Sequence, residues 1–264
     1  MNLTTDDLES GTLFFQCNVC GQQCTAELDF LGREVVSCSG CGSNPRIRAV
    51  IRALSTELLG KDLILPDFPD RRSIKGLGLT DWEGYSSLLA QKFDYLNTYL
   101  HQEPRLDISA TDIPPERRSA YDFVISSEIF EHVVPPVEKA FQNVVTMLKP
   151  GGLFVLTVPY GLQSHTIEHF PELDRFTVTE RDGVYHLDNM TKTGISQSFT
   201  DLVFHGGPGS TLEMRIFAES AVLQHCRAAG FQSITVHRRP DFQHGIWWPE
   251  PWSFPITAKK GDHH

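Results

Sequence analysis

The fold is decided by YDFVISSEIFEHV, residues 121–133, and LKPGGLFVLTVPY, residues 148–160. Each stretch contains a short and nearly continuous apolar run, at 121–126 and at 153–158, which is typical of strands in the interior of a sheet. A helical pattern at 136–148 lies between the two runs. This strand, helix, strand order predicts parallel strands with a helix packed on the sheet.

The same alternation continues on both sides of this unit. Further strands are expected at 73–77, 95–100, 233–237 and 254–258, and further helices at 82–93 and 218–229. The chain therefore predicts an α/β fold with a mostly parallel sheet covered by helices on both faces. The last two strands are joined by a loop rich in proline and tryptophan, which favours an antiparallel final strand.

Composition places the chain among ordinary globular proteins, with 264 residues, 40% hydrophobic and 21% charged. No run approaches the roughly 20 apolar residues of a membrane-spanning helix, and the acidic start MNLTTDDLES differs from a secretory signal. We expect a cytoplasmic protein without membrane contact. The net charge of −10 gives no general attraction for a polyanion.

Five of the six cysteines lie between residues 17 and 41. The pairs Cys17-x2-Cys20 and Cys38-x2-Cys41 are separated by 17 residues, the spacing of a four-thiolate zinc ribbon. Such a site is coordinatively closed, so its Zn²⁺ is structural and contributes folding free energy. Cys24 is left over as a small core residue or a further metal contact, and a chance cluster of thiols is the alternative to a metal site.

These patterns divide the chain into an arm and ribbon at 1–45, a linking helix and connection at 46–72, and a main domain at 73–264. The helix RIRAVIRALSTELL begins at Arg46. Its arginines either lie on a solvent-exposed helix face or contact a phosphate. Periodicity weakens at about 160–217, which we interpret as an insertion over the active site with a hairpin at 181–183.

A glycine turn, SIKGLGLTDWEGY, precedes these motifs at 73–85. Together with 121–133 and 148–160 it resembles the class I methyltransferases that use S-adenosylmethionine (SAM). The resemblance implies a Rossmann-like fold and SAM as the cofactor, with an N-terminal zinc ribbon of the kind that some bacterial members carry. A dinucleotide site is the alternative, but Asp81 replaces the third glycine of that fingerprint and repels a pyrophosphate.

The resemblance also assigns cofactor residues. Glycines would cradle the methionine part, Asp107 at the end of a short third strand would meet the adenine, and a Ser-Glu pair would open onto the cofactor. The second strand ends in Asn97 where an acid normally holds the ribose, which leaves Asn97 or Asp81 for that contact. The cofactor-binding set is thus Gly76, Gly78, Asp81, Asn97, Asp107, Ser127 and Glu128.

Methyl transfer to a hydroxyl needs an aligned acceptor and a base. The candidate catalytic bases are His132, His165 and His169, with His205 as a further histidine. If the segment 165–169 is helical, one of its faces carries His165, Glu168 and His169. These residues then either take part in catalysis, bind a metal, or are ordinary surface residues. Glu213 and Arg215 either pair with each other or orient a substrate.

Three functions follow from these features. The first is SAM-dependent methylation, at oxygen or nitrogen, of a small-molecule or saccharide acceptor enclosed under the insertion. The second is methylation of RNA with the ribbon as the recognition module, which the net negative charge of the chain disfavours. The third is a protein that binds SAM or a partner without transferring a methyl group.

Overall fold

The structure, a computed structural model, describes residues 11–262; residues 1–10, which hold most of the expected N-terminal arm, and 263–264 lie outside the described residues. Within residues 11–262 the main sheet has six strands in the order β15-β16-β6-β5-β3-β4. Their bounds are β3 (Arg71–Leu79), β4 (Phe93–Thr98), β5 (Tyr121–Ser127), β6 (Leu148–Thr157), β15 (Phe231–Val236) and β16 (Ile256–Lys260). The pairs β3·β4, β3·β5 and β5·β6 are parallel.

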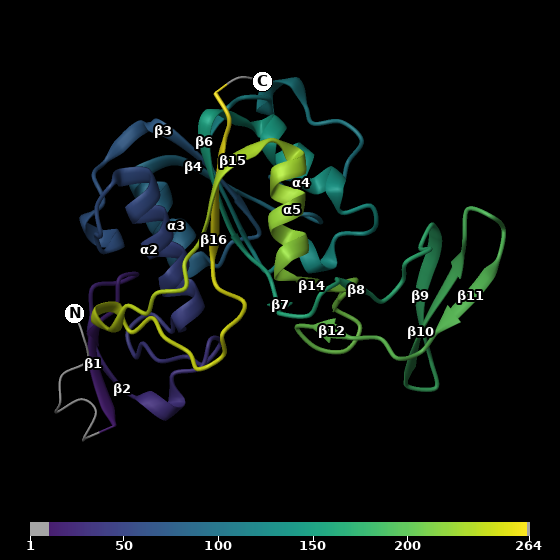
Figure 1. The fold of residues 1–264 in the computed structure, drawn as a ribbon, viewed down its shortest axis with the longest axis horizontal. Coiled ribbons are helices and arrows are strands. Elements are labelled where there is room, and N and C mark those ends of the chain that lie inside the picture. The colour runs from purple at the N-terminus through teal and green to yellow at the C-terminus, as the bar shows by residue number, and fades with distance from the viewer. Residues whose placement is uncertain (1–10, 263–264) are drawn as a thin grey trace.

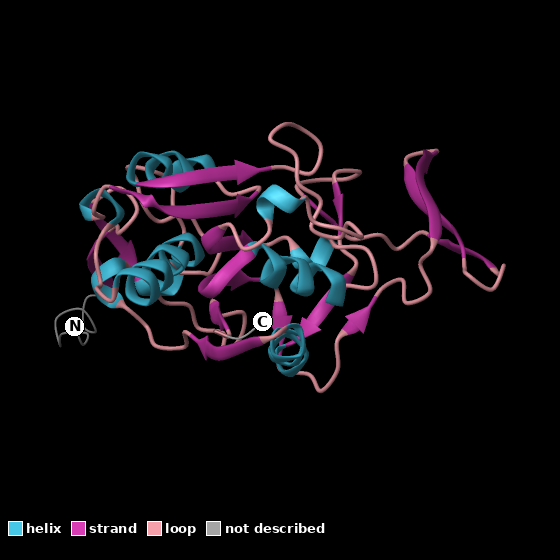
Figure 2. Ribbon diagram, turned by 90° about the horizontal axis from the view of Figure 1, so that it is seen from above, coloured by secondary structure: helices cyan, strands magenta, loops and turns pink. Residues whose placement is uncertain are grey.

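Helices cover both faces of this sheet (Figures 1 and 2). They are α2 (Pro45–Leu59), α3 (Glu83–Lys92), α4 (Glu138–Met147) and α5 (Glu219–Ala229). Successive β5 residues point to opposite faces: Phe123 joins the apolar cluster under α2 and α3, and Val124 joins the cluster under α4 and α5. The expected α/β class, with helices on both faces of a mostly parallel sheet, is confirmed.

The final strand is antiparallel, as expected, because β16 pairs antiparallel with both β6 and β15. The prediction of a short third strand is wrong: between β4 and β5 the described residues form no strand, and Tyr99 and Arg105 make only an isolated bridge. The backbone oxygens of Ile108 and Ala110 instead accept hydrogen bonds from the Asn143 side chain of α4, both at 2.8 Å. Asp107 therefore lies on a loop.

Residues 160–218 contain short strands, which are β7 (Tyr160–Gly161), β8 (Ile167–Glu168), β9 (Arg175–Arg181), β10 (Val184–Met190), β11 (Ser196–Phe199), β12 (Phe204–His205), β13 (Thr211–Leu212) and β14 (Arg215–Ala218). Strands β9 to β11 form a separate antiparallel sheet, which stands away from the main sheet in Figure 1. The expected hairpin joins β9 to β10, and Asp182 and Gly183 both have positive φ, 53° and 78°. This is the backbone of a tight hairpin turn.

The N-terminal part shares its core with the main sheet. Strands β1 (Thr12–Gln16) and β2 (Gln23–Glu27) form a hairpin, and α2 begins where Asn44 Oδ1 accepts a hydrogen bond from Ile47 N at 2.9 Å. Phe15 and Leu31 belong to the same buried cluster as Phe93 and Val155. The ribbon and the sheet therefore stabilise each other, although the domain boundaries stay a prediction.

Short 3-10 turns complete the described chain: η1 (Leu28–Phe30), η2 (Leu65–Asp67), η3 (Pro115–Arg117), η4 (Phe130–His132) and η5 (Phe242–His244). Among residues 11–262, none of the helices combines the length and the apolar character needed to cross a bilayer.

Candidate functional site

A cavity of about 240 Å³ lies beyond the carboxyl ends of β3 and β4. In open α/β sheets ligands usually bind beyond the carboxyl ends of the strands, at the point where the strand order reverses. In this sheet the order reverses at β3, which has β4 on one side and β5 on the other. The lining is mainly apolar: Leu79, Thr80, Thr98, Leu100, Leu106, Asp107, Ile108, Ser109, Ile129, His132, Val133 and Val134. The site is therefore an apolar slot with few polar groups.

Two of the residues singled out in the sequence, Asp107 and His132, line this cavity. Asp107 Oδ1 accepts hydrogen bonds from Ser109 N at 2.8 Å and from Ser109 Oγ at 2.6 Å. These bonds fix the carboxylate and leave Oδ2 available to a ligand. Asp107 is thus not on a strand but lines the cavity, and its contact with adenine stays a prediction.

The glycines and their polar neighbours are not among the residues that line the cavity. A side chain at Gly76 would collide with Phe123 and Tyr95, and one at Gly78 would meet Tyr95, Asp81 and Asn97. The buried Asp81 carboxylate accepts a hydrogen bond from the Tyr95 hydroxyl. The Asn97 amide bonds to the backbone N and O of Asp81, both at 2.9 Å. These residues brace the loop that follows β3.

Burial raises the pKa of Asp81 to about 7. An unfolded carboxyl has a pKa near 3.9, so between about pH 4 and 7 the folded state holds a proton that the unfolded state lacks. We expect the free energy of unfolding to fall with rising pH in this window, by at most about 1.4 kcal/mol per pH unit. Asp81→Asn should remove this contribution, measured by urea unfolding from pH 4.5 to 8. Asp94→Asn, an exposed control, should retain it; equal slopes in D81N and wild type would contradict the assignment.

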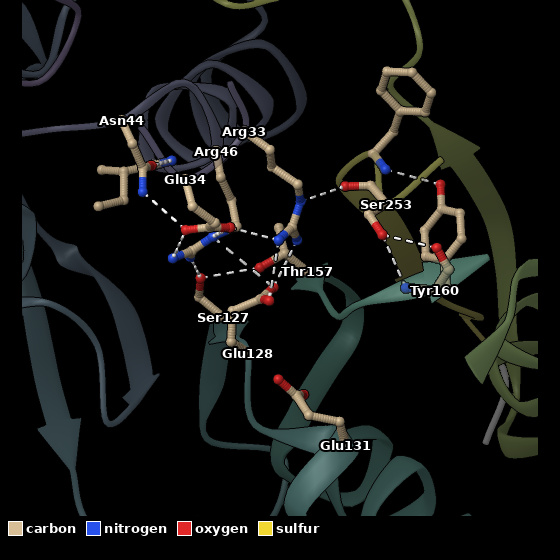
Figure 3. A network of polar contacts seen from close by, with 12 residues as sticks. Arg33, Glu34, Asn44, Arg46, Ser127, Glu128, Glu131, Thr157, Tyr160 and Ser253 are labelled. Atoms are coloured by element: carbon tan, nitrogen blue, oxygen red, sulfur yellow. Dashed lines mark hydrogen bonds and ion pairs between the residues drawn. The ribbon is translucent and has the colours of Figure 1, made fainter. Parts of the chain in front are cut away.

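Ser127 ends β5, Glu128 follows it, and both meet arginines from the N-terminal part (Figure 3). The Glu128 carboxylate accepts two hydrogen bonds from the Arg33 guanidinium, at 2.7 and 3.1 Å. Ser127 Oγ accepts one hydrogen bond from Arg46 at 2.5 Å. Burial opposes charge on Glu128, but Arg33 holds the pKa of this carboxyl below its ordinary value. Glu128 also has φ of 57°, a strained conformation of the kind found at functional sites.

The arginines of α2 do not form a solvated face. Arg48 is fully buried and donates to the backbone oxygens of Ser43 at 2.9 Å and Gly245 at 2.7 Å. Arg46 pairs with Glu34 as well as with Ser127. The sequence did not single out Arg33 at all, since its contact with Glu128 spans 95 residues.

Two of the three candidate bases belong to one cluster, because His132 packs against His205, and Glu213 contacts both His205 and His169. His132 lies at the cavity, where its Nδ1 contacts the Leu212 carbonyl oxygen at 2.9 Å and burial lowers its pKa. His165 is exposed beside Ser164. His169 Nε2 lies 2.9 Å from Glu213 Oε1.

The segment 165–169 is not helical, because Ile167 and Glu168 pair with β14, so the condition for a shared helical face is not met. The pairing of Glu213 with Arg215 is also wrong. Arg215 Nε donates to Glu168 at 2.7 Å, while Glu213 faces His169 and His205, each at 2.9 Å.

Glu131, which the sequence did not single out, lies next to this group. It is fully buried, and both of its carboxylate oxygens lack a hydrogen-bond partner among the described residues. Figure 3 shows its carboxylate separate from the arginine network. Burial raises the pKa of Glu131 well above its ordinary value. Its signal in the sequence was only its place beside His132.

The four ribbon cysteines converge: the Sγ atoms of Cys17, Cys20, Cys38 and Cys41 lie within 4.8 Å of one another. Separations of 3.7 Å for Cys17–Cys41 and for Cys20–Cys38 fit the roughly 3.8 Å between thiolates that each bind tetrahedral zinc at about 2.3 Å. The residues therefore fit a structural Zn²⁺. Cys24 Sγ also lies 3.5 Å from Cys38 Sγ.

Residues 90–156 match a family described as a methyltransferase domain. This segment includes Asp107, Ser127, Glu128 and His132. It supports a methyltransferase. No curated protein matches the chain.

Solved structures with a similar architecture include methyltransferases that use SAM. One from Clostridium acetobutylicum is 15% identical, with 79% of this chain and 97% of that chain covered and a TM-score of 0.41. The sugar N-methyltransferase KedS8 from Streptoalloteichus is 13% identical, with 84% and 89% covered and a TM-score of 0.47. CalS10, an amino pentose methyltransferase from Micromonospora echinaspora, is 14% identical, with 83% and 92% covered and a TM-score of 0.43.

Proposed function

We propose that this protein transfers a methyl group from SAM to a small-molecule or saccharide acceptor, at oxygen or nitrogen. The observation that carries the proposal is the cavity beyond β3 and β4, with Asp107 on its wall and His132 beside it. The methyltransferase family match over 90–156 supports the same reading.

The cavity suits the adenosyl end of SAM. Leu79, Leu106 and Ile108 offer apolar surface to an adenine ring, and Asp107 Oδ2 is available to accept from its amino group. A volume of about 240 Å³ is below the roughly 300–1,000 Å³ of sites that hold whole cofactor-sized ligands. We place the methionine end outside it, toward Glu128 and Ser127, with the loop after Gly78 held by Asp81 and Asn97.

The acceptor side is acidic and partly enclosed. His132, His205, Glu131 and Glu213 gather between η4 and the strands of 160–218. In-line methyl transfer needs the acceptor aligned with the sulfonium carbon, and a hydroxyl acceptor must also lose a proton. Such a group of histidines and carboxylates serves that need, while its negative charge disfavours a polyanionic acceptor.

Calorimetry with SAM, followed by a turnover assay for S-adenosylhomocysteine over a panel of hydroxyl and amino acceptors, tests the proposal. We expect SAM to bind one to one and turnover with at least one compact acceptor. Absence of SAM binding would reject the cofactor assignment. Turnover only with RNA, at an affinity that falls steeply with salt, would reject the acceptor class.

Asp107→Ala is expected to weaken SAM binding by ~1–3 kcal/mol, or about 5- to 150-fold, because the ligand loses a charged hydrogen-bond acceptor. Asp112→Ala, on the same loop but exposed, is the matched control and should bind as wild type does. Calorimetry with SAM on both variants measures the difference. An unchanged dissociation constant for D107A would remove Asp107 from the cofactor site.

A further inference from the structure

We propose that Glu131, His132 and His205 form a binding site for a divalent transition-metal ion, distinct from the cysteine cluster. One ligand atom from each lies within 4.8 Å of the others. Glu131 and His132 come from η4 and His205 from β12, so the site joins the end of β5 to the 160–218 segment. This inference goes beyond the proposed function and does not depend on it.

Contacts on the far side of each imidazole orient the ligand nitrogens. His132 Nδ1 lies 2.9 Å from the Leu212 carbonyl oxygen, which only accepts, so the proton of neutral His132 is on Nδ1. His205 Nε2 lies 2.9 Å from Glu213 Oε2, the distance of an ion pair. Nε2 of His132 therefore presents a lone pair, and Nδ1 is the nitrogen of His205 that lies toward Glu131. Carbonyl and carboxylate partners of this kind support histidine ligands in metal sites.

Both of these nitrogens lie near the same carboxyl group. Glu131 Oε1 lies 3.6 Å from His132 Nε2 and 4.0 Å from His205 Nδ1, which is too long for hydrogen bonds. Three groups that can bind a metal ion thus converge, and Glu131 is fully buried with neither oxygen hydrogen-bonded among the described residues. Ligands about 2.0–2.2 Å from one metal lie at most about 4.4 Å apart, so an ion between these atoms satisfies the buried carboxylate.

A second group of acids and histidine does not share these properties. Asp62, Asp241 and His244 also lie close together, but Arg52 Nε contacts Asp241 Oδ2 at 2.6 Å and Asp62 Oδ2 at 3.2 Å. The guanidinium already supplies the positive charge there. The inference is therefore confined to the Glu131 group.

Two imidazoles and one carboxylate suit ions such as Zn²⁺, Mn²⁺, Fe²⁺ or Co²⁺, and three protein ligands leave coordination positions open. His132 lines the cavity, and the His205 side chain is 38% exposed, so an ion and an exogenous oxygen ligand can both reach the site. The ligand class that fits the open positions is an oxygen ligand such as water or an alcohol hydroxyl, whose pKa a bound cation lowers.

Co²⁺ titration of the full chain, with its ribbon zinc retained and monitored by elemental analysis, tests the site. We expect one equivalent of Co²⁺ to bind beyond the ribbon zinc, with visible absorption typical of nitrogen and oxygen ligands. Glu131→Gln and His205→Ala should each abolish binding at the concentration that saturates wild type. Glu213→Gln should weaken it about 10- to 100-fold, since it supports His205 without binding the ion.

His101→Ala, an exposed histidine outside the group, is the matched control and should bind Co²⁺ as wild type does. Circular dichroism checks that each variant is folded, and E131Q removes a buried carboxylate without changing its size. The proposal is overturned if wild type binds no Co²⁺ beyond the ribbon zinc. It is equally overturned if folded E131Q and H205A bind Co²⁺ as wild type does.

Discussion

Replacing Cys38 with serine is expected to release zinc from the ribbon and to destabilise the protein by several kcal/mol. Structural zinc in isolated fingers contributes apparent binding free energies of about 10–16 kcal/mol, and only part of that is lost here because packing also holds the ribbon. Cys38 Sγ lies 3.7 Å from Cys20 and 3.5 Å from Cys41, so its loss removes one corner of the cluster. Elemental analysis and thermal unfolding with and without added Zn²⁺ measure both effects.

Cys24 is the neighbour that can substitute for a lost ligand, at 3.5 Å from Cys38 Sγ. The double variant C24S/C38S therefore accompanies the single one. Cys226→Ser is the matched control, because it removes a buried thiol in α5 far along the chain from the cluster. One equivalent of zinc and wild-type stability in C24S/C38S would show that these thiols hold no structural metal.

Release of zinc should also disturb the cofactor site. Arg33 follows η1 in the ribbon, and its guanidinium holds Glu128 in the bidentate pair, while the first turn of α2 places Arg46 on Ser127. Because ribbon and sheet residues share one apolar cluster, loosening the ribbon displaces both arginines. We therefore expect C38S to bind SAM more weakly than wild type even where the main sheet remains folded.

Local signals explain why much of the fold could be predicted. Helix α2 begins at an Asn-Pro pair and ends at Gly60, which has φ of 65°, so its bounds follow from capping and backbone preferences alone. The sequence of β5 is a continuous apolar run because its residues pack into the apolar clusters on both faces of the sheet. Such features depend on neighbours in sequence, and they were predicted to within a few residues.

The candidate site depends on contacts that no local pattern encodes. Arg33 reaches Glu128 across 95 residues, and His132 reaches Leu212 across 80. Glu213 and Arg215 are two residues apart, which suggested a pair, but each meets a partner on another segment. Asp107 lines the cavity from a loop and not from its expected strand, and Asn143 donates to the backbone oxygens of Ile108 and Ala110 in that loop.

Arg215→Met is expected to lower the free energy of unfolding by about 3–5 kcal/mol, because two backbone carbonyls and the partly exposed Glu168 carboxylate lose a charged donor. The Arg215 side chain is fully buried, and its Nη1 donates to the backbone oxygens of Phe130 at 2.9 Å and Val133 at 2.6 Å. Its Nε holds Glu168 at 2.7 Å. Methionine fills similar space but leaves all three oxygens without this donor. Urea unfolding of both proteins measures the loss.

The matched control is Arg238→Met, which removes an exposed pairing with Glu219 and should cost less than about 1 kcal/mol. Because the Phe130 and Val133 carbonyls flank Glu131 and His132, R215M should also weaken the binding of SAM and of Co²⁺, whereas R238M should not. Arg215→Lys keeps the charge but lacks the planar fork, so it should fall between wild type and R215M. If R215M unfolds at the same urea concentration as R238M, Arg215 does not hold η4 in place, and the geometry of the cluster at Glu131 has another origin.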